Sequence, residues 1–153
     1  DSMRSKCVAL SIFRPMCAGL AGFSANQSLA VSIREMSQGL VKPTDLLRVL
    51  QQEFGVGLAV GVVLGAILFG VGAVWANVAG WPGGPWLGLV IGASIPATIV
   101  FAVTLGGAVP LFLKRVNVDP AMASGPIITT AVDFFAFFAV LGLALLMIEK
   151  LTL

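Results

Sequence analysis

The chain has 153 residues, of which 58% are hydrophobic and only 10% are charged, whereas about a quarter of the residues in soluble domains are charged. This composition excludes a soluble globular protein and a disordered chain. The net charge of +2 is spread over several short segments, which argues against a nucleic-acid partner. No histidine occurs in the chain, so imidazole-based catalysis and metal binding are absent and we expect no enzymatic activity.

The chain is expected to cross a membrane several times. No Asp, Glu, Lys or Arg lies between Glu53 and Lys114, and a single helix of about 60 residues would be about 90 Å long, roughly three times the thickness of the hydrocarbon layer. The chain must therefore fold back across the bilayer. The sequence predicts an all-α, multi-pass protein of the cell membrane, with four apolar segments as transmembrane helices at about 12–33, 55–77, 87–113 and 120–148.

The first apolar segment is less hydrophobic than the others, and its small residues suggest a helix buried among other helices. Cys7 and Cys17 lie before and within it. They lack a metal-binding spacing, so they are either buried small apolar residues or a disulfide, and the sequence leaves both open.

Two connections follow. Residues 43–53 carry apolar side chains at a spacing that suits a short amphipathic helix at the membrane interface, although a solvated connector is an equal alternative. Residues 81–86 (WPGGPW) combine turn formers with two interfacial tryptophans, which predicts a loop at a membrane surface.

The last segment begins at Asp119 and Pro120, because Asp is a favoured N-cap residue and Pro is favoured at the first helical position. We interpret Asp119 as a helix cap, with an ion ligand as the alternative. Lys114 and Arg115 close the preceding segment.

Basic residues predict the orientation. The first and third loops are basic and the second is not, so the positive-inside rule makes the first and third loops cytoplasmic and places residues 81–86 and the C-terminus outside. The N-terminus would then also lie outside, although it carries Arg4, Lys6 and Arg14. Position 1 is not Met, so we expect residues 1–14 to be the remnant of a longer chain with at least one earlier span.

Two helices carry small and polar residues every fourth position, which places them on one helix face. These stripes are Ala18, Gly22, Asn26 and Ala30 in the first segment and Ala121, Gly125, Thr129 and Asp133 in the last. Such stripes could line a pathway or simply pack helices closely. Gly57, Gly61 and Gly65 in the second segment have the same spacing, and for these three we favour packing.

Asp133 is the only acidic residue inside any of the predicted spans. A carboxylate at this depth costs a few kcal/mol unless it meets water, a partner or an ion. It is either a neutral structural group bonded to Thr129 or Thr130, or the partner of a hydrated cation. Oxygen ligands without His suit a hard ion such as Mg²⁺, which keeps most of its water, and Pro126 in the same helix frees a carbonyl, as is tolerated beside an aqueous cavity.

These residues resemble a known family. The segment from Asp119 to Asp133 (DPAMASGPIITTAVD) is similar to the start of the last transmembrane helix of MgtE-type magnesium transporters, and the segment from Ala21 to Gln27 (AGFSANQ) to that family's second-helix motif. Their order and spacing match, and the resemblance covers about residues 15–150. Phe23 stands where many relatives have Asn, and Gly125 where some have Asn.

The resemblance implies a homodimeric, five-helix, Mg²⁺-selective channel-like domain that lacks its first helix here. A cytoplasmic magnesium-sensing region normally precedes this domain. Asp133 corresponds to the pore carboxylate that holds hydrated Mg²⁺, Asn26 to a pore-lining amide, and Gly125 and Thr129 to groups on the ion-facing side. We therefore expect a dimeric Mg²⁺ channel, with Mg²⁺ as the transported ion. The alternatives are a cation-coupled secondary transporter and a non-conducting membrane anchor.

Overall fold

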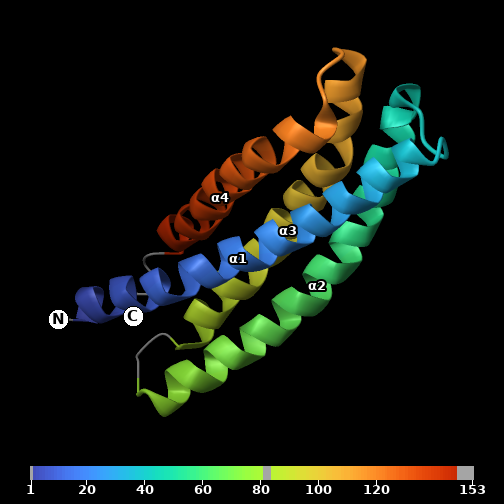
Figure 1. The fold of residues 1–153 in the computed structure, drawn as a ribbon. Coiled ribbons are helices and arrows are strands. Elements are labelled where there is room, and N and C mark those ends of the chain that lie inside the picture. Colours follow the sequence, from blue (N-terminus) through green and yellow to red (C-terminus); the bar gives the residue numbers. More distant parts are fainter. Residues whose placement is uncertain (1, 81–83, 148–153) are drawn as a thin grey trace.

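The computed structural model describes residues 2–80 and 84–147. Within these residues the chain is helical and has no strand. It forms four long helices and one short 3-10 helix, which are α1 (Ser2–Ser37), η1 (Pro43–Asp45), α2 (Leu46–Val78), α3 (Gly84–Arg115) and α4 (Pro120–Leu146). The all-α prediction is confirmed. Figure 1 shows α2 and α4 on opposite sides of α3, with α1 running across them, and α3 packs against each of the other three long helices.

Three helical segments are long and apolar enough to cross a membrane, at Pro43–Val78, Gly88–Arg115 and Pro120–Leu146. α1 has the length for a span, at 36 residues, but it is less apolar than these three. Its role as a fourth span stays a prediction.

The helices extend beyond the predicted segments. α1 begins at Ser2 rather than near residue 12 and continues to Ser37. α2 begins at Leu46, so residues 46–53 are neither a separate interfacial helix nor a solvated connector, and both interpretations were wrong. The reason is that residues 46–53 are good helix formers with no Gly or Pro among them. The predicted start near residue 55 followed the last charged residue, Glu53. This residue marks where the apolar stretch begins, whereas the helix begins earlier.

The first and third connections lie at the same end of the bundle. Arg115, at the end of α3, donates a hydrogen bond from Nε to the carbonyl oxygen of Pro43 at 2.6 Å. The end of α2 and the start of α3 lie at the other end of the bundle (Figure 1). There Gly80 follows α2 with a φ of +66°, a left-handed conformation that stops the helix. Of the predicted WPGGPW loop, residues 81–83 lie outside the described residues, and Gly84 already begins α3.

Glycines let α2 and α3 approach closely. A Cβ atom built on Gly61 would lie 2.7 Å from Cα of Pro96, and one on Gly65 would lie 2.5 Å from the carbonyl oxygen of Gly92. Gly57 faces Val100 in the same way. The structure therefore confirms the packing interpretation of these three glycines.

Small residues also mediate the contact of α1 with α3. Ser28 and Ser32 are buried, and their hydroxyls donate to the carbonyl oxygens of Val103 and Gly107 at 2.9 and 3.0 Å. These bonds satisfy the serine hydroxyls in the interior, where an unpaired polar group is costly. The first apolar segment was expected to be buried among other helices, and this is confirmed for the face of α1 that carries Ser28 and Ser32.

Cys17 is a free thiol that is only 1% exposed. It lies on the same helix as Cys7, and ten residues of helix separate two Cα atoms by about 15 Å, whereas a disulfide needs less than about 7 Å. The structure thus supports the buried apolar interpretation for Cys17 and rules out a disulfide between the two.

Candidate functional site

The inner face of α4 packs into the bundle and its small polar stripe does not. The buried residues of this helix recur every fourth position and are Ser124, Ile128, Val132, Ala136, Val140 and Ala144. Thr129 and Asp133 each follow a buried residue by one position and are exposed, while Gly125 is half-buried. The stripe predicted on α4 therefore points out of the four-helix unit.

The stripe on α1 is arranged in the same way. Ala21 and Ala25 are fully buried in one cluster with Ile128 and Val132 of α4, and Asn26, one position after Ala25, is exposed. α1 and α4 run antiparallel (Figure 1). In an antiparallel pair of right-handed helices, the residues that follow the contact positions turn toward the same side of the pair.

Asn26, Thr129 and Asp133 are therefore brought to one side of the α1–α4 pair. Residues of both helices pack together in one buried cluster. The polar surface lies beside the contact and not within it.

Asp133 lies on the exposed side of α4, where it lines an open cavity of about 380 Å³ together with Phe134, Phe137, Phe138 and Leu141. The rings of Phe134 and Phe138 are 5.5 Å apart. Among the described residues, no hydrogen bond or ion pair engages the Asp133 carboxylate. The three rings form an apolar border beside the exposed carboxylate.

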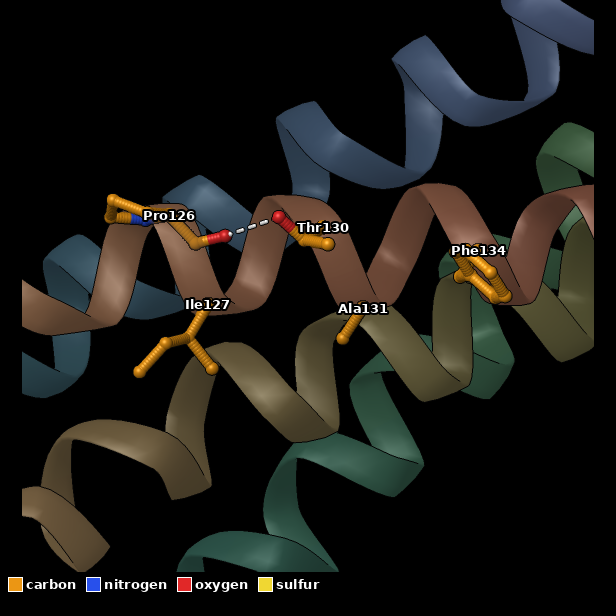
Figure 2. Close-up of a pocket in the computed structure, with 5 residues that line it drawn as sticks. All are labelled: Pro126, Ile127, Thr130, Ala131 and Phe134. Atoms are coloured by element: carbon orange, nitrogen blue, oxygen red, sulfur yellow. Dashed lines mark hydrogen bonds between the residues drawn. The ribbon is translucent and has the colours of Figure 1, made fainter.

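Thr130 does not supply that partner. Its hydroxyl donates to the carbonyl oxygen of Pro126 at 2.9 Å, one turn earlier in α4. Figure 2 shows this bond within a shallow pocket of about 510 Å³ on the outer surface of α4, lined by Pro126, Ile127, Thr130, Ala131 and Phe134. The pocket is mostly apolar and its one hydroxyl is already bonded, so it offers little to an ion.

The glycines of the two stripes differ from those of α2. A Cβ atom built on Gly22 or on Gly125 would meet nothing within 4 Å. Inside one copy these glycines therefore pack against nothing. This difference agrees with the packing interpretation that the sequence favoured for Gly57, Gly61 and Gly65.

Asp119 caps α4 as predicted. Its carboxylate accepts a hydrogen bond from the backbone N–H of Ala121 at 2.9 Å, and Pro120 occupies the first helical position. This bond satisfies one of the unpaired N–H groups at the helix start.

Sequence reasoning placed Glu53 at the end of a connection and did not select it as a site residue. Because α2 is continuous from Leu46, Glu53 is a half-buried residue inside that helix and not part of a surface connector. Its spacing from Val49 and Gly57, which are both buried, was the available signal, since residues four apart share a helix face. No group of three or more Cys, Asp or Glu side chains is gathered to hold a metal anywhere in the described residues.

Comparison with known proteins identifies the family. Residues 14–143 match the family model of the MgtE divalent cation transporters. The chain belongs to the MgtE family. The resemblance seen in the sequence is confirmed, and this is a family of multi-pass membrane transporters and not of enzymes.

The chain is 33% identical over 144 residues to the magnesium transporter MgtE of Bacillus subtilis, covering 94% of this chain and 31% of that protein. It is 34% identical over 149 residues to the magnesium transporter MgtE of Thermus thermophilus, covering 97% of this chain and 32% of that protein. The chain thus spans about a third of the length of the curated relatives that it matches.

Proposed function

We propose that the chain forms part of a Mg²⁺ transport pathway, a channel-like pore between two copies of the domain. Asp133 is its central carboxylate, with Asn26, Thr129 and Gly125 on the ion-facing side. Support comes from family membership and from the magnesium transport named for two similar proteins.

The observation that carries the proposal is the outward direction of the polar stripe. If the Asp133 carboxylate faced lipid, its transfer from water would cost a few kcal/mol of free energy. The polar side chains of Asn26 and Thr129 on the same side would add to this cost. Burial of the stripe against a second copy around a two-fold axis removes it from lipid and brings two carboxylates to one axis.

A pore of this kind suits a hydrated ion. Each copy contributes one carboxylate, one amide and one hydroxyl, and all of these contain oxygen acceptors. Mg²⁺ dehydrates reluctantly and keeps several waters, whose hydrogens point outward toward such acceptors. The open space beside Gly22 and Gly125 leaves room for those waters.

The test is Mg²⁺ uptake into liposomes that contain the transporter, comparing Asp133→Asn with wild type. The substitution keeps the size and most hydrogen bonding of the side chain and removes the charge. We expect uptake to fall at least tenfold while helicity and thermal stability are kept or improve, because an unpaired carboxylate is removed. Asp119→Asn is the matched control, since Asn also caps a helix, and its uptake should match wild type.

The alternatives predict other outcomes. Uptake that requires a sodium or proton gradient would indicate a cation-coupled transporter, and no uptake by the wild type would indicate a membrane anchor. Wild-type uptake by Asp133→Asn would refute the assigned role of this carboxylate.

A further inference from the structure

The first and third connections, which lie at the same end of the bundle (Figure 1), carry a basic surface. It consists of Lys42, Arg48, Lys114 and Arg115, all of which are exposed. Lys42 directly precedes η1, Arg48 lies in the first turn of α2, and the other two lie in the last turn of α3. Because η1 contacts both α2 and α3, these charges from two connections lie in one region.

Arg115 holds the two connections together. Its Nε donates to the carbonyl oxygen of Pro43 at 2.6 Å, which places the end of α3 beside Pro43 and the preceding Lys42. This bond uses one of the guanidinium N–H groups, and the others can reach a further acceptor. Phosphate oxygens suit them, because a guanidinium binds phosphate through two parallel hydrogen bonds.

The positive charges of the basic surface are not neutralised within the described part of the chain. No ion pair engages any of these four side chains among the described residues. Two acids lie close by in the sequence, and both accept hydrogen bonds from backbone N–H groups. The Asp45 carboxylate accepts from the N–H of Lys42 and the Asp119 carboxylate from that of Ala121, each at 2.9 Å. The basic surface therefore presents its charge to an anion outside the chain.

The position of the basic surface points to a lipid. Two of the segments that are able to span a membrane, Pro43–Val78 and Gly88–Arg115, have one end there, where the headgroups of a bilayer lie. Long basic side chains at the end of a span reach toward this layer. Exposed apolar side chains also flank the charges in the sequence, and these are Leu40, Leu47, Phe112 and Val116. A soluble anion would use only the charges, whereas a phospholipid also offers acyl chains to the apolar groups.

We propose that the basic surface binds the headgroup phosphate of an anionic phospholipid. Four or more basic residues directly beside a membrane span attract anionic lipids, and each charge strengthens the attraction about fivefold. This end of the bundle is predicted to be cytoplasmic, and the cytoplasmic leaflet is the one that carries anionic lipids. A lipid held by both connections joins the start of α2 to the end of α3 and reinforces the bond of Arg115 to Pro43.

The experiment measures lipid binding to the purified transporter by native mass spectrometry. The probe is dimyristoyl phosphatidylglycerol, and the reference is dimyristoyl phosphatidylcholine, which has the same acyl chains and no net charge. We expect the first phosphatidylglycerol to bind at least tenfold more tightly than the first phosphatidylcholine.

Substitutions test the residues. Lys42→Gln combined with Lys114→Gln removes two charges and leaves the bond of Arg115 to Pro43 intact. It should weaken phosphatidylglycerol binding at least tenfold and change phosphatidylcholine binding less than twofold. Arg48→Gln alone should weaken phosphatidylglycerol binding about fivefold, and it covers the case in which the double variant fails to fold.

Two controls separate a lipid site from general attraction. Arg34→Gln removes one exposed charge in the last turn of α1, outside the basic surface, and should weaken phosphatidylglycerol binding less than twofold. Glycerol 3-phosphate carries the phosphate without acyl chains, and at a concentration equal to that of the lipid it should displace no phosphatidylglycerol.

Equal binding of the two lipids would overturn the proposal, and so would unchanged phosphatidylglycerol binding by the folded double variant. An effect of Arg34→Gln as large as that of Arg48→Gln would show general attraction in place of a site. Displacement by glycerol 3-phosphate would show a site for soluble anions and would also overturn the proposal. None of these outcomes depends on the role of Asp133, because lipid binding and not Mg²⁺ uptake is measured.

Discussion

Gly61 on α2 lies directly against the backbone of Pro96 on α3, so that a Cβ atom at position 61 would come within 2.7 Å of Cα of Pro96. The contact is backbone against backbone, and no flexible side chain can move aside. We expect Gly61→Ala to push the two helices apart and to destabilise the fold by about 1–3 kcal/mol.

This prediction is checked by thermal unfolding in detergent. Gly70→Ala is the control, because a Cβ atom there meets nothing within 4 Å. It should leave the unfolding midpoint unchanged or raise it slightly, since Ala favours helix over Gly by up to about 1 kcal/mol. Equal midpoints for both variants would contradict the close packing of α2 on α3.

Asp119 is expected to stabilise α4 as a cap and to take no part in ion binding. Asp119→Ala removes the acceptor of the Ala121 N–H bond and should cost about 1 kcal/mol, whereas Asp119→Asn keeps the cap and should cost little. Unfolding midpoints measure the first effect and Mg²⁺ uptake the second. Uptake reduced by Asp119→Asn as far as by Asp133→Asn would show that Asp119 is an ion ligand.

The proposed dimer predicts cross-linking along the polar stripe. Thr129 is exposed on a single copy, so Thr129→Cys should form a disulfide-linked dimer when two stripes face each other around a two-fold axis. Val62→Cys, which is also exposed but lies on α2, should remain monomeric under the same oxidation. Monomers alone for Thr129→Cys, in membranes that still take up Mg²⁺, would refute the two-fold pore.

The predicted orientation is tested with cysteines in the connections. Ala79 and Val118 are exposed, and neither has the positive φ of the neighbouring Gly80 and Asn117, so substitution causes little strain. In intact cells, Ala79→Cys should react with an impermeant maleimide from outside, and Val118→Cys should react only after permeabilisation. The unmodified chain, which carries Cys7 and Cys17, gives the background, and the reverse labelling would invert the topology.

Much of the fold followed from composition and local chemistry. The uncharged stretch from Glu53 to Lys114 predicted helices that fold back across a membrane, because a bilayer limits the length of each crossing. Asp119 and Pro120 located the start of α4 because capping depends on neighbouring residues alone. The start of α2 was missed, because the last charge before the apolar stretch, at Glu53, lies inside the helix and not at its start.

The candidate site was predicted residue by residue but without its direction. Asp133 was identified from the cost of a carboxylate in a bilayer, and Asn26 and Thr129 from helix periodicity and a family resemblance. Periodicity shows which residues share a face, but it does not show what that face meets. Gly61 and Gly125 share the same four-residue spacing, and only the structure shows that one packs against Pro96 and the other meets open space.

The sequence by itself determined that this protein is an all-α membrane protein, because hydrophobicity, charge position and capping act over a few residues and can be read along the chain. The resemblance of two of its motifs to the MgtE transporters indicated the family. Tertiary structure alone decided which face of each helix is buried. It directed the Asp133 stripe out of the four-helix unit, and it set Glu53 beside a cavity lined by residues of α1, α2 and α3. These placements depend on contacts such as those of Ser28 with Val103 and Glu53 with Gly107, which join residues more than fifty positions apart and leave no local pattern.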